Sequence, residues 1–301
     1  MPYFEINIKE NYKGYLWAFT SVLAVSNVYI FSKIALNEIN IIQFGFYWFG
    51  FGLLWFILLA NFRESIVKIK KIPKNAIKIY VLIGILETIS TTSFFYAMDI
   101  IENPSVTSFL TNLTPILVAI LSYFILKEKF SKIEIIGTIL AISGAFIISY
   151  MGNTSLDSFL LHGASYVYLT SITGAMVMIV VKKNIRALSP QILTLNRTVF
   201  LFFFSVIFMI LSSQSPVISK KSFYALAVGS LLGPFLTTIA AYNALKYLEA
   251  YKQSIINSSK SVFVLIGAFI FFGNLPMKFQ IIGGIFTIAG VLLVSFGKRK
   301  K

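Results

Sequence analysis

Three ionisable side chains, Glu87, Arg197 and Lys260, lie deep inside long apolar stretches of the sequence. A charged residue at the centre of a membrane helix costs about 2.5–3.5 kcal/mol on insertion scales, so such residues usually face a protein interior and serve a function. A carboxylate beside an ammonium or guanidinium group can form an ion pair, exchange a proton or give way to a charged solute. These three residues are therefore the first candidates for chemistry in this chain.

Glu87 and Lys260 lie at similar depths in their stretches. Glu87 follows Lys78 by nine residues, and Lys260 follows Lys252 by eight. At about 1.5 Å per helical residue, both side chains lie about 12–14 Å from one end of their helices. We therefore predict that Glu87 and Lys260 can pair, either as a permanent salt bridge between two helices or as a bridge that opens with substrate or proton.

Arg197 has two possible roles, and two other ionisable residues lie nearer the ends of apolar stretches. Arg197, flanked by Asn196 and Thr198, could bind an anionic group in a cavity or extend to the lipid headgroups. We expect Lys33 to extend its ammonium group to the interface, and we expect His162 to be an interfacial residue rather than a proton relay.

Uncharged side chains complete the candidate site. Thr91 shares a helix face with Glu87, because it follows four residues later. Asn112 and Asn257 occupy matching places in the two halves of the chain, and we expect both at a cavity. Four aromatic residues near these positions could stack on a planar substrate: Trp17, Tyr96, Tyr168 and Tyr242.

The elements that must position these residues are membrane helices. The chain of 301 residues is 57% hydrophobic and only 12% charged, against about 25% charged for a soluble domain. We predict an all-α integral membrane protein with ten spans, each about twenty residues long as a bilayer requires. The predicted spans are 14–36, 41–61, 77–100, 104–126, 132–151, 161–182, 190–211, 222–247, 250–273 and 278–297.

The positive charges predict the orientation. Most of the 26 lysines and arginines cluster at one set of span ends, and only Lys220, Lys221 and Lys278 lie at the opposite set. Because cytoplasmic loops carry the excess of positive charge, we expect both termini in the cytoplasm. Frequent isoleucine, lysine, asparagine and phenylalanine are typical of an AT-rich bacterial genome, so we place the protein in a bacterial inner membrane.

The two halves of the chain resemble each other. Asn-Leu-Thr-Pro at 112–115, Ile-Ile-Gly at 135–137 and Gly144 are matched by Asn-Ser-Ser-Lys-Ser at 257–261, Ile-Ile-Gly at 281–283 and Gly290. We therefore predict two five-helix units, residues 1–152 and 153–301. Five is odd, so the second unit enters the membrane inverted, which is the architecture of secondary transporters that alternate access to a central site.

At these residues the chain resembles the EamA-like branch of the drug/metabolite transporter superfamily. The resemblance rests on these pieces: Ser26-Asn27 followed by Lys33, Phe95-Tyr96-Ala97-Met98, Leu113-Thr114-Pro115, Leu126-Lys127-Glu128-Lys129, and Gly137 and Gly144 echoed by Gly283 and Gly290. It implies a ten-helix carrier of small organic solutes with a cavity between its halves. The chain departs from the family by having Lys260-Ser261 in place of Glu-Pro, and Phe272-Gly273-Asn274 in place of the second Leu-Gly-Glu.

The sequence also excludes several classes. Without cysteine and with one histidine, we expect no disulfide, metal site or cofactor, and we expect no enzyme because no nucleophile–base pair is apparent. No phosphate-binding G-x-x-x-x-G-K-[ST] loop occurs, and the basic residues mark span ends rather than a nucleic-acid surface.

The partners we expect are therefore a small-molecule substrate, the lipid bilayer and a coupling proton or ion. We predict a secondary-active transporter of a small polar metabolite, an amino acid or a related anionic or zwitterionic solute, with S-adenosylmethionine as a specific case. An exporter of hydrophobic cations or drugs and a non-transporting membrane subunit are the alternatives.

Overall fold

The computed structural model describes residues 8–60, 69, 72–101, 104–149, 163–272 and 277–296, and these residues form helices without a strand. The helices of the first half are α1 (Ile8–Leu36), α2 (Ile41–Leu59), α4 (Lys74–Ile100), α5 (Pro104–Thr111), α6 (Leu113–Leu121), the π-helical η1 (Ser122–Leu126) and α7 (Lys132–Ser149). Those of the second half are α8 (Ala164–Asn184), α9 (Pro190–Leu211), α10 (Lys220–Ser230), the π-helical η3 (Leu231–Thr237), α11 (Thr238–Tyr247), α12 (Ala250–Ser258), α13 (Lys260–Phe272) and α14 (Lys278–Phe296).

These helices confirm the predicted all-helical membrane fold. Eight helices within the described residues are long and apolar enough to cross a bilayer. The broken helix α5–α6–η1 and α7 complete the ten predicted crossings. The start of α1 and the end of α14 lie at the same end of the bundle, where the Tyr15 hydroxyl donates to the Ser295 carbonyl at 2.8 Å. We call this the terminal end; whether it faces the cytoplasm stays a prediction.

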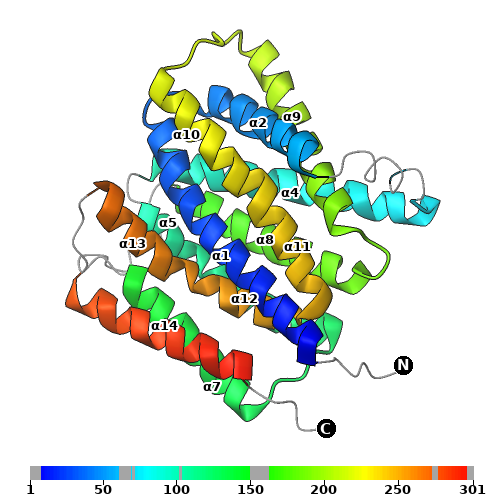
Figure 1. Ribbon diagram of the computed structural model, residues 1–301, viewed down its shortest axis with the longest axis vertical. Helices are drawn as coiled ribbons and strands as arrows, with labels where there is room; N and C mark the ends of the chain where they lie inside the picture. Colours follow the sequence, from blue (N-terminus) through cyan, green and yellow to red (C-terminus); the bar gives the residue numbers. More distant parts are fainter. Residues whose placement is uncertain are drawn as a thin grey trace.

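The two halves interlock rather than lie apart (Figure 1). Helix α1 packs chiefly against α10, η3, α11 and α13 of the second half. Its counterpart α8 packs chiefly against α4 and α6 of the first half. The first helix of each half thus packs against the other half. The bundle therefore consists of two groups of helices, and each group contains helices of both halves.

Helices α7 and α14 form a tight pair at one side of the bundle (Figure 1). A Cβ atom added to Gly290 would lie 2.3 Å from the Ala141 nitrogen, and one added to Gly144 would lie 2.4 Å from the Thr287 nitrogen. Small residues allow membrane helices to approach this closely. The glycines that repeat in the two halves therefore form a seam that joins the last helix of each half.

Two helices break at related places. In the first half, α5 ends at Thr111 and α6 starts at Leu113, since Pro115 has no N–H to donate to the Thr111 carbonyl. In the second half, α12 ends at Ser258 and α13 starts at Lys260, without a proline. The breaks meet: the Ser108 and Ser261 hydroxyls lie 3.1 Å apart, and Asn112 Nδ2 lies 3.4 Å from Ser261 Oγ.

The third irregular helix contains Pro234, which lies in η3. The Thr237 hydroxyl donates to the Leu232 carbonyl at 2.8 Å, so a side chain satisfies backbone freed by the irregular turn. Gly229 and Gly233 contact the Trp48 ring, and a Cβ on either would lie within 2.7 Å of it. This pair of glycines therefore serves packing within the bundle.

Candidate functional site

A cavity of about 220 Å³ lies between the interlocked halves. Helices α1, α2, α4 and α8 contribute to its wall together with α9, η3 and the broken helices. All three ionisable residues singled out from the sequence line it: Glu87, Arg197 and Lys260. The prediction that charged side chains inside the spans face a common interior space agrees with this placement.

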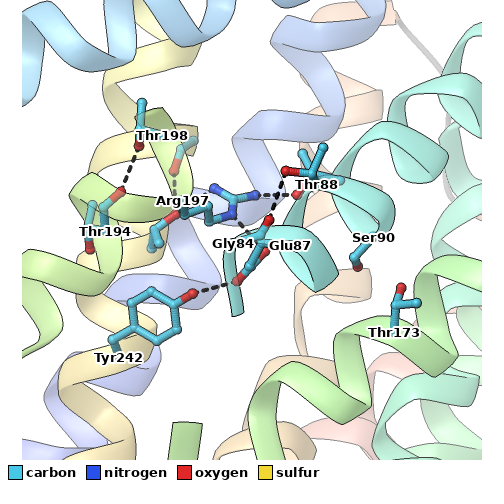
Figure 2. Close-up of polar contacts among 12 residues, drawn as sticks. Gly84, Glu87, Thr88, Ser90, Thr173, Thr194, Arg197, Thr198 and Tyr242 are labelled. Carbon is cyan, nitrogen blue, oxygen red and sulfur yellow. Dashed lines mark hydrogen bonds and ion pairs between the residues drawn. The ribbon is translucent and has the colours of Figure 1, made fainter. Parts of the chain in front are cut away.

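Glu87 pairs with Arg197, not with Lys260 (Figure 2). Arg197 Nε donates to Glu87 Oε2 at 2.8 Å, and the Tyr242 hydroxyl donates to Glu87 Oε1 at 2.5 Å. The Glu87–Lys260 bridge expected from equal depth is therefore wrong in this structure. Counting residues gives the height of a side chain along a helix but not the direction in which it points, and α9 is the helix that places a base beside Glu87.

The remaining donors of Arg197 are also satisfied. Nη1 donates to the Thr238 hydroxyl and Nη2 to the Thr91 hydroxyl, each at 2.9 Å. Of the two alternatives for Arg197, the structure shows the inward one, since the guanidinium lies among α4, α9 and α11 rather than at a headgroup. We call Glu87, Thr91, Arg197, Thr238 and Tyr242 the paired cluster.

Lys260 differs from every member of the paired cluster. Its side chain is 4% exposed and lines the cavity. Within the described residues its ammonium group has neither an ion-pair partner nor a hydrogen-bond acceptor. Since Glu87 and Arg197 neutralise each other, Lys260 leaves one uncompensated positive charge on the wall of the cavity between the halves. Such a charge is costly until an anionic group meets it.

Two neutral groups share the cavity wall with Lys260. Asn257 precedes it by about one turn on the broken helix α12, and Thr114 lies on α6 at the matching place of the first half. Neither side chain hydrogen-bonds to another described residue. Lys260, Asn257 and Thr114 thus form what we call the open cluster, with one charged donor, one carboxamide and one hydroxyl available to a solute.

Asn112, the predicted counterpart of Asn257, lies beside the cavity rather than on its wall. It is fully buried, and its Nδ2 faces Ser261 across the contact of the two breaks. Its Oδ1 has no hydrogen-bond partner in the described part of the chain. Asn112 therefore contacts the break between α12 and α13, where Lys260 begins α13.

The predicted aromatic residues divide. Tyr242 reaches Glu87 through its hydroxyl, whereas three others lie away from the cavity wall: Trp17, Tyr96 and Tyr168. Trp17 packs on the α1–α14 side of the core, Tyr96 is 36% exposed and stacks on Tyr166, and Tyr168 packs near Val167. These three aromatic residues therefore lie on helix faces that pack against the protein core or are exposed on the outside of the bundle.

The aromatic wall of the cavity comes instead from Tyr29, Trp48, Phe94 and Phe95. Phe94 follows Glu87 by seven residues, so the helical spacing marks it as sharing that face. Trp48 lies in an aromatic-rich apolar stretch and Tyr29 lies between Ser26-Asn27 and Ser32-Lys33, and the sequence analysis singled out neither. Tyr29 is anchored by its hydroxyl, which lies 3.1 Å from that of Thr111.

Lys33 does not extend to the interface as expected. It is 8% exposed, and its ammonium donates to the carbonyls of Met98 and Ile101 at the end of α4. Helix C-termini leave carbonyls unsatisfied, and they attract cations. The carbonyl groups at the end of α4 therefore bind the Lys33 ammonium group, which was expected to extend to the lipid headgroups. His162 lies outside the described residues.

A buried carboxylate at the terminal end caps another helix. Glu128 accepts from the backbone N–H of Ala250 at 3.0 Å and of Tyr251 at 3.3 Å, at the start of α12. Burial raises the pKa of Glu128 above its ordinary value, while these two hydrogen bonds act to lower it. The sequence singled out Glu128 only as part of the family-like Leu-Lys-Glu-Lys piece, and the structure shows that its carboxylate caps the start of α12.

Comparisons with known proteins agree with this architecture. The sequence matches the model of the EamA-like transporter family twice, over residues 12–150 and 161–296. It is 24% identical over 254 residues to the uncharacterized transporter YyaM of Bacillus subtilis (strain 168), covering 82% of each chain. It is 34% identical over 103 residues to the uncharacterized transporter YetK of the same strain, covering 34% of this chain and 30% of that one.

A solved crystal structure of a protein has the same fold. It superposes with a TM-score of 0.72 and covers 93% of this chain and 96% of its own, at 13% sequence identity. At that identity the likeness concerns the fold alone.

Proposed function

Because this chain belongs to the EamA-like transporter family, and is thus a multi-pass membrane transporter, we propose that its cavity carries a small polar solute with an anionic group by alternating access. The solute class is an amino acid or a related anionic or zwitterionic metabolite. The gradient of the solute or of a coupling ion supplies the energy.

The uncompensated ammonium group of Lys260 is the observation that carries this proposal. A carboxylate or phosphate entering the cavity would replace water at a desolvated cation and form a charge-assisted hydrogen bond, about twice as strong as a neutral one. Asn257 and Thr114 add neutral donors and acceptors beside it. The open cluster therefore supports recognition of one negative group and its polar neighbours.

The size of the cavity favours a small solute. A volume of about 220 Å³ lies below the roughly 300–1,000 Å³ typical of sites for drug-sized ligands. An amino acid or short organic acid is of suitable size, with an apolar portion against Tyr29, Phe94 and Phe95. S-adenosylmethionine would require a wider state of the same cavity.

The alternative of a hydrophobic-cation exporter finds less support. Glu87 is the carboxylate of the cavity wall, and its oxygens already accept from Arg197 and Tyr242. A cation would have to displace Arg197 while lying in the same space as Lys260. Both steps oppose binding of positive charge.

Ligand-induced thermal stabilisation of the purified protein tests the proposal. A library of amino acids, short carboxylates, phosphorylated metabolites and hydrophobic cations is screened, because a bound ligand raises apparent stability by mass action. We expect hits among anionic and zwitterionic solutes. For a hit, Lys260→Met should weaken affinity about 10–100-fold, the size of a hydrogen bond to a charged group, and Lys260→Arg should retain more of it.

The exposed Lys278 provides the matched control. Lys278→Met removes the same charge at the end of the bundle opposite the terminal end, away from the cavity, and should leave affinity unchanged. Hits confined to hydrophobic cations, or an anion affinity that Lys260→Met does not alter, would overturn the proposal.

A further inference from the structure

Lys33 joins two helices that otherwise touch little. It lies near the end of α1 opposite the terminal end, and its Nζ donates to the Met98 carbonyl at 3.0 Å and to the Ile101 carbonyl at 3.2 Å. Both carbonyls belong to the last turn of α4, where no further helical N–H is available. Apart from this point, α1 packs chiefly on helices other than α4.

Lys182 makes the same contact at the terminal end. It lies in the last turn of α8, and its Nζ donates to the Leu245 carbonyl at 2.8 Å and to the Leu248 carbonyl at 2.5 Å. These carbonyls end α11, which otherwise packs little against α8. A lysine on the opening helix of each half thus caps the third crossing of that half.

The inverted repeat explains why the two contacts lie at opposite ends. Helix α8 corresponds to α1 and α11 corresponds to the end of α4, and the capped carbonyls of the two halves match at one constant offset along the chain. Because the second unit is inverted, the same local contact appears once at each end of the bundle. The cavity, with its wall from α1, α4 and α8, lies between them.

The contacts also join the two groups of helices that form the cavity. One group is α1 with η3 and α11; the other is α4 with α6 and α8. Lys33 on the first group binds the second group at one end, and Lys182 on the second group binds the first at the terminal end. To admit a solute from either end, the groups must separate at that end, and separation there breaks that lysine's two hydrogen bonds.

The chemistry of these contacts suits a bond that opens and closes. Each lysine Nζ donates to two carbonyl oxygens, and carboxylates lie within electrostatic reach: Asp99 of Lys33, and Glu128 and Glu249 of Lys182. Water entering the opened end can hydrate both the ammonium group and the helix-end carbonyls, which makes the exchange nearly balanced. A buried carboxylate–lysine pair would resist separation more strongly.

We propose that Lys33 and Lys182 are paired latches of the transport cycle: Lys33 holds the cavity shut at the end away from the termini, and Lys182 holds it shut at the terminal end. Both latches are engaged in this structure. The inference rests on the proposed alternating access but not on the identity of the solute. Each lysine acts through the helices it joins and is a positioning residue rather than a ligand.

The absence of cysteine from the sequence allows a direct test. Val28→Cys places a single thiol on the cavity wall, at a side chain without polar contacts. A membrane-impermeant maleimide is applied to vesicles of either orientation, and the ratio of the labelling rates from the two faces is measured. We expect Lys33→Gln and Lys182→Gln to change this ratio about tenfold in opposite directions, which corresponds to about 1.4 kcal/mol.

Lysines at the same ends without a latch provide matched controls. Lys220→Gln and the exposed Lys183→Gln should leave the ratio unchanged. If a glutamine variant fails to fold, Lys33→Arg or Lys182→Arg keeps the charge on a differently shaped head and should shift the ratio in the same direction by a smaller factor.

Equal ratios in folded latch variants, shifts in the same direction, or labelling from one face alone in every variant would overturn the latches. Because the assay uses no solute, its outcome is separate from the Lys260 binding test. Loss of the Lys260 effect with opposite latch shifts would overturn the proposed solute class and leave the latches standing.

Discussion

The cavity has two clusters of buried polar groups that differ in how far their charges are satisfied. In the paired cluster, Glu87 and Arg197 neutralise each other and use Tyr242, Thr91 and Thr238 as further partners. In the open cluster, Lys260 has no such partner among the described residues. A protein can bury a charge either to fix its own helices or to bind something else, and we propose the second role for Lys260.

The clusters also rest on different kinds of backbone. The ion pair of the paired cluster comes from the interiors of the unbroken helices α4 and α9, which fix side chains firmly. The open cluster comes from the breaks at Asn112 and Ser259, where helix ends meet inside the bundle. Irregular backbone at membrane depth is tolerated where it lines a cavity, so the breaks and the uncompensated charge belong together.

The largest expected effect is on the paired cluster. Arg197→Met removes the partner of Glu87 and leaves a carboxylate uncompensated in the bundle. We expect the free energy of unfolding to fall by about 3–5 kcal/mol, the usual cost of breaking one side of a buried pair. Thermal unfolding of the purified protein in detergent measures the change.

A double variant tests whether the stranded Glu87 carboxylate causes the loss of stability in Arg197→Met. Glu87→Gln together with Arg197→Met removes both charges, and we expect it to recover most of the lost stability. If the double variant is as unstable as the single one, packing rather than the stranded charge is responsible, and the distinction between the two clusters loses its basis.

The same substitution in the open cluster should have the opposite sign. Lys260→Met removes a charge that nothing nearby compensates, so we expect the free energy of unfolding of the solute-free protein to rise by about 1–3 kcal/mol. Solute affinity should fall about 10–100-fold at the same time. A loss of stability on this substitution would mean that Lys260 has a structural partner. The charges of both clusters would then be satisfied within the protein, and the contrast between the clusters would be wrong.

A change far from the cavity sharpens this contrast by separating stability from binding. Gly290→Ala would bring a Cβ within 2.3 Å of the Ala141 backbone and force α14 away from α7. We expect a loss of about 1–3 kcal/mol in unfolding free energy, typical of an overpacked site, with solute affinity retained. Thermal unfolding and ligand titration on the same samples measure both.

Gly284 on the same helix is the matched control. A Cβ at Gly284 meets no atom within 4 Å, so Gly284→Ala should be neutral or slightly stabilising, because alanine favours helix. Equal losses at both positions would argue that a factor other than the α7–α14 contact, such as packing against lipid, governs this side of the bundle.

The sequence predicted the features that depend on composition and repetition. Ten crossings, the shared end of α1 and α14 and the inward placement of Glu87 and Lys260 follow from apolar length, charge asymmetry and charge cost. Each is a property of one helix taken alone or of a match between two stretches of sequence. For Arg197 the sequence left the cavity and the lipid headgroups as alternatives.

The features that the sequence missed depend on rotation and packing between helices. Equal depth could not tell whether Glu87 faces α9 or α13, and so the Arg197 partner went unrecognised. The capping of α4 by Lys33 requires a helix end to lie beside the lysine, which no local pattern records. Trp17, Tyr96 and Tyr168 lie at sequence positions near the predicted site, but their side chains pack against the core or are exposed on the outside of the bundle.

The smallest expected effect concerns Glu38, a carboxylate with several partners but in contact with solvent. It accepts from the Ser219 and Ser222 hydroxyls and pairs with Lys221 at 2.9 Å, linking the end of α1 to the start of α10. The hydrogen bond from Ser219, followed by the Lys221 and Ser222 contacts, lowers the pKa of Glu38 from 4.5 to about 2. A lowered pKa of an acid means that the folded state favours its charged form, so the stability it contributes is present above pH 4.5 and is lost as the pH falls toward 2.

Glu38→Gln should therefore lower the melting temperature slightly at neutral pH, and the difference from the unsubstituted protein should narrow as the pH falls from about 5 to about 3. Because the group is exposed, the effect should remain far below that of Arg197→Met, although the described residues give Glu38 three side-chain partners and Glu87 two. A comparable loss at Glu38 would show that the number of contacts, and not burial, sets the cost of disturbing a carboxylate in this protein. That result would remove the physical argument for treating Lys260 as a site left open for a solute.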